Sequence, residues 1–384
     1  MPDTKTQPLR VLQVLARDTL AGTEIMTATL AERLPGDEVH STVAILDAPG
    51  PIAGRLRAAG VEVASLGAGG AARATLGLAR LIRHGSFDVV CAYGLRASWV
   101  ARVAARGLSS RSALICGVHG LHVTEIMDVR SMRARCALVL ERLGSPLVDV
   151  YEANSEGAVE LLASGGIDRG RLVHIPHGLD LDEWPDPGPR PSREAPPTVI
   201  CVARFAPVKR HLDLIEAAGR VAGRGTRFRL VLIGDGPERA AIERRVTELG
   251  LGGRTEFAGS VGRDEVRRRL LEADVVSLLS QSEGMSGTVV EAMACGLAVV
   301  GTATNGIAEL VEHGETGLTV AVGDVEGIAD ALDRLLQDPA ERERMGRRGR
   351  ATVEARWSLE TMLAAKTALY RSVADGHRTM RGRR

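Results

Sequence analysis

Aromatic residues make up only 3% of this 384-residue sequence, and its net charge is +1. Stacking platforms for bases are therefore scarce, and no strong positive field exists to attract a polyanion. Together these absences argue against a nucleic-acid-binding protein. Lysine is also rare, because it occurs only at Lys5, Lys209 and Lys366, whereas arginine is abundant. Hydrophobic residues reach 45%, so the chain has ample material for an aliphatic core.

The chain also lacks the sequence marks of metal, disulfide and membrane proteins. Its five cysteines form no CxxC pair and no Cys/His cluster with metal-ligand spacing. Their odd number and their place in apolar runs favour buried free thiols in a reducing cytoplasm. No apolar segment follows Met1, and no apolar run approaches the ~18 residues of a membrane span. We expect a soluble, cytoplasmic protein, with peripheral contact at the inner face of the plasma membrane left open.

The length exceeds what one core usually supports, so two domains are expected. Short apolar runs alternate with helical patterns from Leu9 to about Ile175, and again from Thr198 onward. Strands separated by helices predict βαβ units and parallel sheets, hence an α/β protein with two Rossmann-like domains. Proline is frequent in the segment between the two series. We predict a first domain over 1–180, a linker over 181–197, a second domain over 198–357 and a last helix over 358–376.

The predicted strands are short, and most are continuous apolar runs. They cover 10–16, 39–46, 61–66, 88–93, 113–118, 149–153 and 172–175 in the first domain, and 198–202, 229–233, 254–257, 275–279, 298–301 and 318–320 in the second. Helical patterns cover 23–34, 96–106 and 133–143, among others. In such folds the carboxyl ends of the strands face the ligand, so the loops that follow strands are where chemistry is expected.

The most informative of these loops carries two carboxylates eight residues apart. Glu283 precedes a predicted helix and Glu291 lies on it. The helix start between them, at 285–288, is rich in small residues, and its free N–H groups and dipole favour an anion. A nucleoside diphosphate sugar has an anionic middle with hydroxyl groups on both sides. Its ribose fits one glutamate and its sugar fits the other.

Two cations follow the first strand of the second domain, at Arg204 and Lys209. They suit a diphosphate whose charge grows as the bond to the sugar breaks. The turn at 234–237, Gly-Asp-Gly-Pro, is not a dinucleotide fingerprint, because GxGxxG would need glycine at 239, which is Arg239. In the first domain Gly22 follows the first strand, where backbone N–H groups could approach a phosphate or sugar.

This ordered set resembles the retaining glycosyltransferases of family 4, which have the GT-B fold. The E-x7-E signature appears as Glu283 and Glu291, with Glu-Gly-Met-Ser where the family usually has Glu-Gly-Phe-Gly. The Arg-x4-Lys spacing is kept, although Ala203 and Arg210 replace the usual glycines. The resemblance covers nearly the whole chain. It implies two Rossmann-like domains facing each other across a cleft, with the final helix packed back on the first domain.

The resemblance also implies roles for individual residues. Glu283 and His119 are the expected catalytic residues, in contact with the donor sugar, and Glu291 is expected to bind the ribose. The expected donor-binding residues are Gly22, Arg204, Lys209, Val261, Met285, Ser286, Gly287, Thr288 and Glu291. Val261 lies in a segment similar to the loop that faces the nucleotide base. His122 is a weaker candidate beside His119.

The implied reaction is transfer of a sugar from a UDP- or GDP-sugar to a hydroxyl acceptor, with retention and without a metal or other cofactor. The Glu-Gly-Met-Ser variant resembles members that assemble polysaccharides, so a glycan or lipid-linked acceptor of the cell envelope or an exopolysaccharide is expected. Asp180-Leu-Asp182 has the form of a metal-binding DxD, but it resembles the family's domain-junction turn, so no metal is predicted there.

Three alternatives stay open at this point. The chain could be a nucleotide-sugar epimerase of the same architecture, which needs extra acid and base groups. It could also bind nucleotide sugars without turnover. The helix around 130–142 mixes basic and apolar positions, which suits either an amphipathic core helix or a docking face for anionic lipid.

Overall fold

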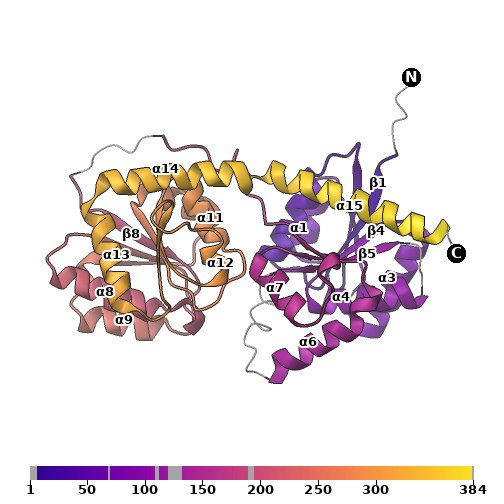
Figure 1. Cartoon of the computed structure of the whole chain (residues 1–384), viewed down its shortest axis with the longest axis horizontal. Coiled ribbons are helices and arrows are strands. Elements are labelled where there is room, and N and C mark those ends of the chain that lie inside the picture. Colours follow the sequence, from indigo (N-terminus) through magenta and orange to yellow (C-terminus); the bar gives the residue numbers. More distant parts are fainter. Residues whose placement is uncertain (1–6, 68–69, 109–111, 120–131, 189–193, 383–384) are drawn as a thin grey trace. The chain divides into compact units, whose positions relative to one another are not determined.

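The chain folds into two compact α/β units (Figure 1). The structure is a computed structural model, and it describes residues 7–67, 70–108, 112–119, 132–188 and 194–382. Unit 1 comprises Met1–His177 and Met362–Arg384, and unit 2 comprises Gly178–Thr361. The last helix, α15 (Leu359–Gly382), therefore begins in unit 2 and contributes most of its length to unit 1.

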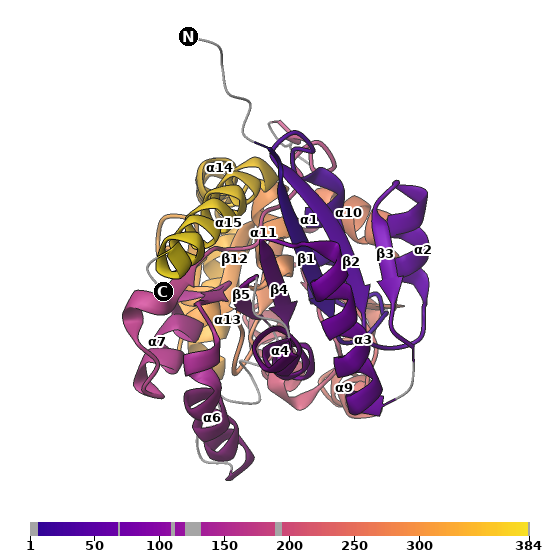
Figure 2. The same cartoon turned by 90° about the vertical axis from the view of Figure 1, so that its right-hand side faces the viewer.

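Unit 1 is built on a seven-stranded parallel sheet in the order β3-β2-β1-β4-β5-β6-β7. Figure 2 shows β5, β4, β1, β2 and β3 side by side. The strands are β1 (Leu9–Leu15), β2 (Val39–Ile45), β3 (Glu62–Ser65), β4 (Val89–Tyr93), β5 (Ala113–Val118), β6 (Val150–Ala153) and β7 (Leu172–His174). Their central members are buried along almost their whole length, as expected when helices cover both faces of a parallel sheet.

Helices connect these strands. They are α1 (Gly22–Arg33), α2 (Pro51–Ala58), α3 (Gly70–Gly85), α4 (Leu95–Arg102), the π-helical turn η1 (Val103–Leu108), α6 (Met132–Gly144), η2 (Ser145–Leu147), α7 (Glu156–Ser164) and η3 (Arg169–Arg171). The helix predicted over 96–106 is thus an α-helix that widens into a π-helical turn at Val103. The final helix α15 returns to this unit and buries Tyr370, Val373 and Ala374.

Unit 2 has a six-stranded parallel sheet in the order β10-β9-β8-β11-β12-β13. Its strands are β8 (Thr198–Val202), β9 (Arg229–Ile233), β10 (Thr255–Gly259), β11 (Val275–Leu278), β12 (Ala298–Thr302) and β13 (Gly317–Val320). Its helices are η4 (Pro207–Lys209), α8 (His211–Gly223), α9 (Arg239–Glu248), η5 (Gly252–Arg254), α10 (Arg263–Glu272), α11 (Gly287–Ala294), α12 (Asn305–Ala308), α13 (Val325–Gln337) and α14 (Pro339–Arg356). The predicted pair of Rossmann-like units is confirmed.

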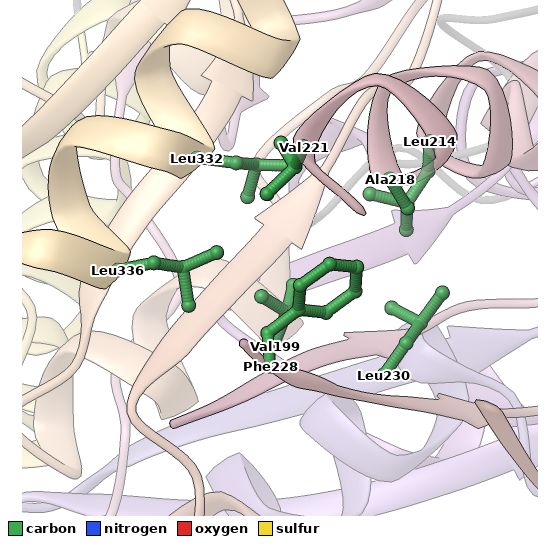
Figure 3. Close-up of a pocket in the computed structure, with 8 residues that line it drawn as sticks. All are labelled: Val199, Leu214, Ala218, Val221, Phe228, Leu230, Leu332 and Leu336. Atoms are coloured by element: carbon green, nitrogen blue, oxygen red, sulfur yellow. The ribbon is translucent and has the colours of Figure 1, made fainter. Parts of the chain in front are cut away.

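The core of unit 2 is apolar and aliphatic. Figure 3 shows one gap in it, between α8, α13 and the strands β8 and β9. Eight apolar side chains line this gap: Val199, Leu214, Ala218, Val221, Phe228, Leu230, Leu332 and Leu336. A ligand site normally offers a few convergent polar groups, and this gap has none. It is a packing defect of the core and not a binding site.

The Pro-rich segment between the two series is partly packed. Trp184, with a side chain 1% exposed, lies in an apolar cluster of unit 2 together with Leu179 and Val353. The carbonyl of Trp184 accepts a hydrogen bond from Arg350. Residues 189–193 of the predicted linker lie outside the described residues. Among the helices that are described, each is too short or too polar to span a bilayer.

Strand order fixes where the loops of each unit meet. In unit 2 the chain runs outward from β8 in one direction to β9 and β10, and in the other to β11, β12 and β13. The carboxyl ends of β8 and β11 are therefore neighbours at the point where the order reverses, which is the usual ligand crevice of such sheets. In unit 1 the corresponding neighbours are β1 and β4.

Candidate functional site

The strand reversal in unit 2 brings together Lys209, which follows β8, and Glu283, which follows β11. Lys209 Nζ donates to Glu283 Oε1, and the same oxygen accepts from Ser280 Oγ at 2.6 Å. The side chains are 23% and 13% exposed, so the pair is half-buried but reachable by a ligand. Two residues 74 positions apart, both predicted from their sequence motifs, thus form one site.

The loop that carries Arg204 is shaped by the turn after β9. A Cβ on Gly234 would come within 2.0 Å of the Ala203 carbonyl oxygen, and one on Gly236 within 2.4 Å of the Phe205 carbonyl oxygen. Only glycine permits this approach, and both residues have positive φ. The Phe205 N–H donates to the Asp235 carbonyl at 2.9 Å, which ties the two loops together. The Gly-Asp-Gly-Pro turn therefore has a structural task.

Arg204 itself is exposed, and it forms no ion pair with any residue that the structure describes. Its neighbour in the motif, Lys209, is already paired with Glu283. The two predicted phosphate-binding cations thus differ in state. The guanidinium of Arg204 is available to an anion, whereas the Lys209 ammonium would contact both Glu283 and any anion that binds.

Helix α11 begins at Gly287, with Ser286 as its N-cap residue. The Ser286 side chain makes no capping hydrogen bond, so it leaves the first-turn N–H groups to another acceptor. Met285 packs against the apolar cluster of unit 2. The Thr288 hydroxyl donates to the Val202 carbonyl at 3.3 Å, so it anchors the helix to β8 and leaves the backbone N–H as the group for a ligand.

Glu291, on α11, is a partly buried carboxyl, with 21% of its side chain exposed. Burial raises its pKa to about 7; Arg263 opposes the shift and Glu183 adds to it. The Arg263 Nε atom lies 3.8 Å from Glu291 Oε1, and Arg263 also pairs with Glu183 at 2.7 Å. Sequence reasoning missed both Arg263 and Glu183, because nothing in their local pattern distinguishes them from other surface charges.

Gly306, on α12, supports the loop of the first glutamate. A Cβ added to it would lie 1.6 Å from the Gly284 carbonyl oxygen and 2.7 Å from that of Glu283. The Thr302 hydroxyl also donates to the Ser280 carbonyl at 2.6 Å. The loop 280–284 is thus held from the β12 side, and Gly306 was not among the predicted site residues.

Val261 and Gly22 are the two remaining predicted donor-binding residues of the described part of the chain. Val261 follows β10 and packs, partly buried, against the apolar cluster of unit 2. Gly22 is the first residue of α1, after an Ala21 N-cap that has no side-chain acceptor. No heavy atom lies within 4 Å of a Cβ built on Gly22, so the space around it is open.

In unit 1, His119 follows β5 and is almost fully buried, with 3% of its side chain exposed. Its Nε2 lies 3.0 Å from Glu152 Oε1, and its Nδ1 lies 3.3 Å from His177 Nε2. The other carboxylate oxygen of Glu152 accepts from Lys366 Nζ, on α15. Both ring nitrogens of the predicted active-site histidine are therefore engaged within unit 1.

Three of these partners were not predicted as site residues. Burial alone would raise the pKa of Glu152, but Lys366 and His119 hold it well below its usual range. Burial, with the charges of His119 and Lys366, holds the pKa of His177 well below its usual range. The scarcity of lysine could have drawn attention to Lys366, because it is one of only three lysines in the chain.

Two remaining candidates need only a brief account. His122 lies outside the described residues. The carboxylate of Asp180 accepts from the Asp182 N–H at 3.2 Å, which is a local turn contact. In the part of the chain that the structure describes, no group of three or more His, Cys, Asp or Glu side chains has an arrangement that could hold a metal ion.

Two family models match the chain, one on each half. The model described as Glycosyltransferase Family 4 matches residues 20–183, and that described as Glycosyl transferases group 1 matches residues 182–352. The boundary between them falls close to the boundary between the two units at His177 and Gly178.

Curated relatives agree with these models. The chain is 30% identical over 275 residues to a GDP-mannose-dependent alpha-(1-6)-phosphatidylinositol monomannoside mannosyltransferase of Mycobacterium tuberculosis, covering 68% of this chain and 70% of the relative. It is 34% identical over 180 residues to the N-acetyl-alpha-D-glucosaminyl L-malate synthase of Bacillus anthracis. That second match covers 47% of this chain and 46% of the relative's length.

Solved structures share the fold. The crystal structure of Anabaena Alr3699/HepE in complex with UDP and glucose superposes with a TM-score of 0.79 at 19% identity, covering 95% of this chain and all of that one. Sucrose-phosphate synthase from Thermosynechococcus elongatus gives a TM-score of 0.78 at 20% identity, covering 96% and 100%.

Proposed function

Because the chain belongs to the group 1 (family 4) glycosyltransferases of GT-B fold, we propose that it transfers a sugar from a nucleoside diphosphate donor to an acceptor hydroxyl with retention of configuration and without a metal. The observation that carries the proposal is the meeting of Lys209 with Glu283 at the strand reversal of unit 2. This reversal is where sheets of this kind bind nucleotides. The unpaired Arg204 and the uncapped start of α11 supply further positive charge beside it.

In this mechanism the diphosphate is both anchor and leaving group. Arg204 and the first-turn N–H groups of α11 bind the diphosphate oxygens. Lys209, which pairs with Glu283, also donates to these oxygens. The negative charge on the diphosphate grows as the bond to the sugar breaks, so these fixed positive groups stabilise the transition state more than the ground state. Glu283 then faces the donor sugar, where positive charge develops at the anomeric carbon.

Glu291 accepts hydrogen bonds from the ribose hydroxyls in the proposed complex. Among the described residues its carboxyl has no ion partner nearer than Arg263, at 3.8 Å, which is shared with Glu183. Ribose hydroxyls would give the carboxylate the hydrogen bonds that burial otherwise denies it. His119 is the proposed contribution of unit 1 to the donor-sugar contact.

The relatives suggest which donors to test. The mycobacterial relative is described as GDP-mannose-dependent, and the Anabaena structure holds UDP and glucose. Both donor types have the layout that the unit 2 site requires. We propose assembly of a cell-envelope or exopolysaccharide glycan as the setting, since the mycobacterial relative is described as acting on a phosphatidylinositol mannoside.

A second feature supports a lipid-linked acceptor and peripheral membrane contact. On α6 the exposed residues Val139, Leu140 and Leu143 are 57%, 51% and 71% exposed, and they recur at helical spacing. The only acidic residue of this helix, Glu141, is buried against Arg102, while Arg142 is exposed. An apolar stripe with an exposed cation and no exposed acid suits the surface of an anionic bilayer.

The function is tested by calorimetry and turnover against a panel of UDP-, GDP- and ADP-sugars, with EDTA present throughout. One donor that binds tightly and is slowly hydrolysed without acceptor supports the proposal and identifies base and sugar. Interconversion of the sugar with no transfer to any acceptor would indicate an epimerase. Binding of a donor without any turnover would indicate a binding protein.

The membrane contact is tested separately, by flotation with vesicles of phosphatidylcholine alone or with phosphatidylglycerol. We expect the protein to float only with the anionic vesicles, and Leu140→Glu/Leu143→Glu to abolish flotation. A matched control, Leu20→Glu, changes an exposed leucine of unit 1 that lies outside α6. Equal flotation of all three proteins would refute the role of α6.

A further inference from the structure

The buried ion pair of Lys366 with Glu152 has a third member, His119. Glu152 is 0% exposed and Lys366 is 2% exposed. One carboxylate oxygen of Glu152 accepts from Lys366, and the other lies 3.0 Å from His119 Nε2. All three residues belong to unit 1, but they come from the last helix, from β6 and from the end of β5.

Stability alone is a weak reason for such a pair. Taking two charges out of water is expensive, and replacement of a buried pair by apolar side chains of similar volume is often neutral or stabilising. What the pair does that apolar side chains cannot do is act on a neighbour. The Glu152 carboxylate lies 3.0 Å from the imidazole Nε2 of His119.

Its effect on that imidazole is specific. The Lys366 ammonium favours the ionised form of Glu152, and an ionised carboxylate can only accept hydrogen bonds. The ring nitrogen facing it must therefore carry the proton, which fixes Nε2–H on His119. The ring is also held from the sides, since its centroid lies 5.2 Å from that of Tyr93 and 4.7 Å from that of His177.

Gly117 makes room for this arrangement. A Cβ on Gly117 would lie 2.4 Å from the Tyr93 ring and 3.5 Å from His119 Nε2. The Lys366 Nζ atom also lies 5.3 Å from the centroid of the Tyr93 ring, within the range of a cation–π contact. Lys366 thus contacts two of the neighbours of His119, the charged Glu152 and the aromatic Tyr93.

We propose that Glu152, held ionised by Lys366 of the last helix, is a positioning residue that fixes the tautomer and orientation of His119 for the donor sugar. This rests on the proposed function, because it assumes that His119 serves the transfer reaction. A fixed Nε2–H leaves Nδ1, the nitrogen now facing His177, as the ring's acceptor.

Two double variants separate positioning from stability. Glu152→Leu/Lys366→Met removes both charges and the acceptor for His119, whereas Glu152→Gln/Lys366→Met removes both charges but keeps an amide oxygen that can accept from Nε2–H. Neither leaves a lone buried charge, so both are expected to fold. A third variant, Arg102→Met/Glu141→Leu, removes the other fully buried ion pair described in unit 1, which does not touch His119.

Turnover is measured as release of UDP or GDP from UDP-glucose and GDP-mannose, and nucleotide affinity by calorimetry with UDP and GDP. We expect kcat to fall about 30- to 100-fold in the Leu/Met variant, the size of effect that misplacement of a reacting group produces. The Gln/Met variant should stay within about fivefold of the parent, as should the Arg102/Glu141 variant. Nucleotide affinity should not change, because unit 2 holds the residues that bind it. Equal kcat in the two position-152 variants would overturn the proposal.

Histidine ¹⁵N NMR gives a readout that does not depend on turnover. The chain has nine histidines, and His119→Gln identifies the signal of His119 by its loss. We expect the Nε2–H tautomer in the parent and in the Gln/Met variant, and a mixture of tautomers in the Leu/Met variant. An unchanged spectrum in the Leu/Met variant would overturn the inference. If the parent shows the fixed tautomer but turns over no donor, the proposed function fails and the tautomer control by Glu152 stands.

Discussion

The two units place a desolvated glutamate, Glu152 in unit 1 and Glu291 in unit 2, in opposite electrostatic surroundings. In unit 1, Glu152 is surrounded by Lys366 and His119, and its pKa is held well below its usual range. In unit 2, the partly buried Glu291 has no ion partner nearer than Arg263, 3.8 Å away, among the described residues, and burial raises its pKa to about 7. The folds of the units are alike, so the difference lies in what the neighbouring elements supply.

The two carboxylates differ in whether their hydrogen-bonding and charged partners are complete. Glu152 has its cation on α15 and its hydrogen-bond donor at the end of β5, so nothing more is needed for it to stay ionised. Glu291 has only Arg263 at 3.8 Å, shared with Glu183. A buried carboxyl with missing partners is typical of a site that a ligand completes. The protein alone therefore fixes the ionised state of Glu152 in unit 1, whereas the ionisation of Glu291 in unit 2 is expected to change when a ligand binds.

The largest expected effect comes from removing Lys366, the cation that pairs with Glu152. Lys366→Met leaves the Glu152 carboxylate buried without its cation, which is expected to lower the free energy of unfolding of unit 1 by about 3–5 kcal/mol. Amide hydrogen exchange in β6 and β5 reads this locally. The matched control is Arg378→Met, which removes a surface pair with Asp88 in the same unit and should cost less than about 1 kcal/mol. Equal losses in the two variants would contradict the account of Glu152.

Next in size is the effect of Lys209→Met on turnover. It removes a positive charge that we propose for the leaving diphosphate, so kcat is expected to fall about 10²- to 10³-fold, or about 2.7–4 kcal/mol of transition-state stabilisation. Donor hydrolysis or transfer gives the measurement. Arg220→Met, which removes an exposed ion pair of unit 2 with Glu326, serves as the control and should leave kcat unchanged. A Lys209→Met enzyme with normal kcat would remove Lys209 from the site.

The incomplete pairing of Glu291 should make the stability of unit 2 depend on pH. The folded pKa of Glu291 is about 7 and its ordinary value is 4.5, so its favourable contribution to stability is fully present below pH 4.5 and is lost as pH rises to 7. Glu291→Gln should flatten that slope and stabilise unit 2 at pH 8 by about 1–3 kcal/mol. Glu152, with its pKa lowered, has the opposite sign, since its contribution is lost as pH falls below 4.5.

Nucleotide affinity gives the functional side of the same test. If the carboxylate form of Glu291 binds the ribose, affinity for UDP or GDP should rise with pH through about 7 and then level off. Glu291→Gln should bind more weakly and lose this dependence. Affinity that is unchanged by the substitution across this range would show that Glu291 does not contact the nucleotide.

The smallest expected effect concerns Arg263. Since Arg263 opposes the upward shift of the Glu291 pKa, Arg263→Gln should move the midpoint of the pH profile for nucleotide binding to higher pH. At pH 7 the affinity should drop by a factor of about 2–5, or about 0.4–1 kcal/mol. Arg268→Gln, which changes an exposed arginine on α10 paired with Glu265 and Glu272, is the control. A midpoint that stays in place would mean that Arg263 does not act on Glu291.

Much of the fold could be predicted from the sequence, because most of the parallel strands are short apolar runs that end at a turn signal. The strands predicted at 113–118, 198–202 and 229–233 match β5, β8 and β9 residue for residue. In unit 2 the motif residues Lys209 and Glu283 meet as a single site, since both follow strands that are neighbours at the reversal. The roles assigned to individual site residues stay predictions.

The sequence by itself determined two α/β units, a family, and the local motifs that follow strands, because apolar periodicity, glycine turns and charge spacing are properties of short segments. Only the tertiary structure decided that Lys366 reaches Glu152 from 214 residues away, that Glu152 faces His119, and that Arg263 and Glu183 flank Glu291. Burial and pairing of a charge depend on which distant elements pack against it. No local pattern contains that information, although the scarcity of lysine pointed to Lys209 and could have pointed to Lys366.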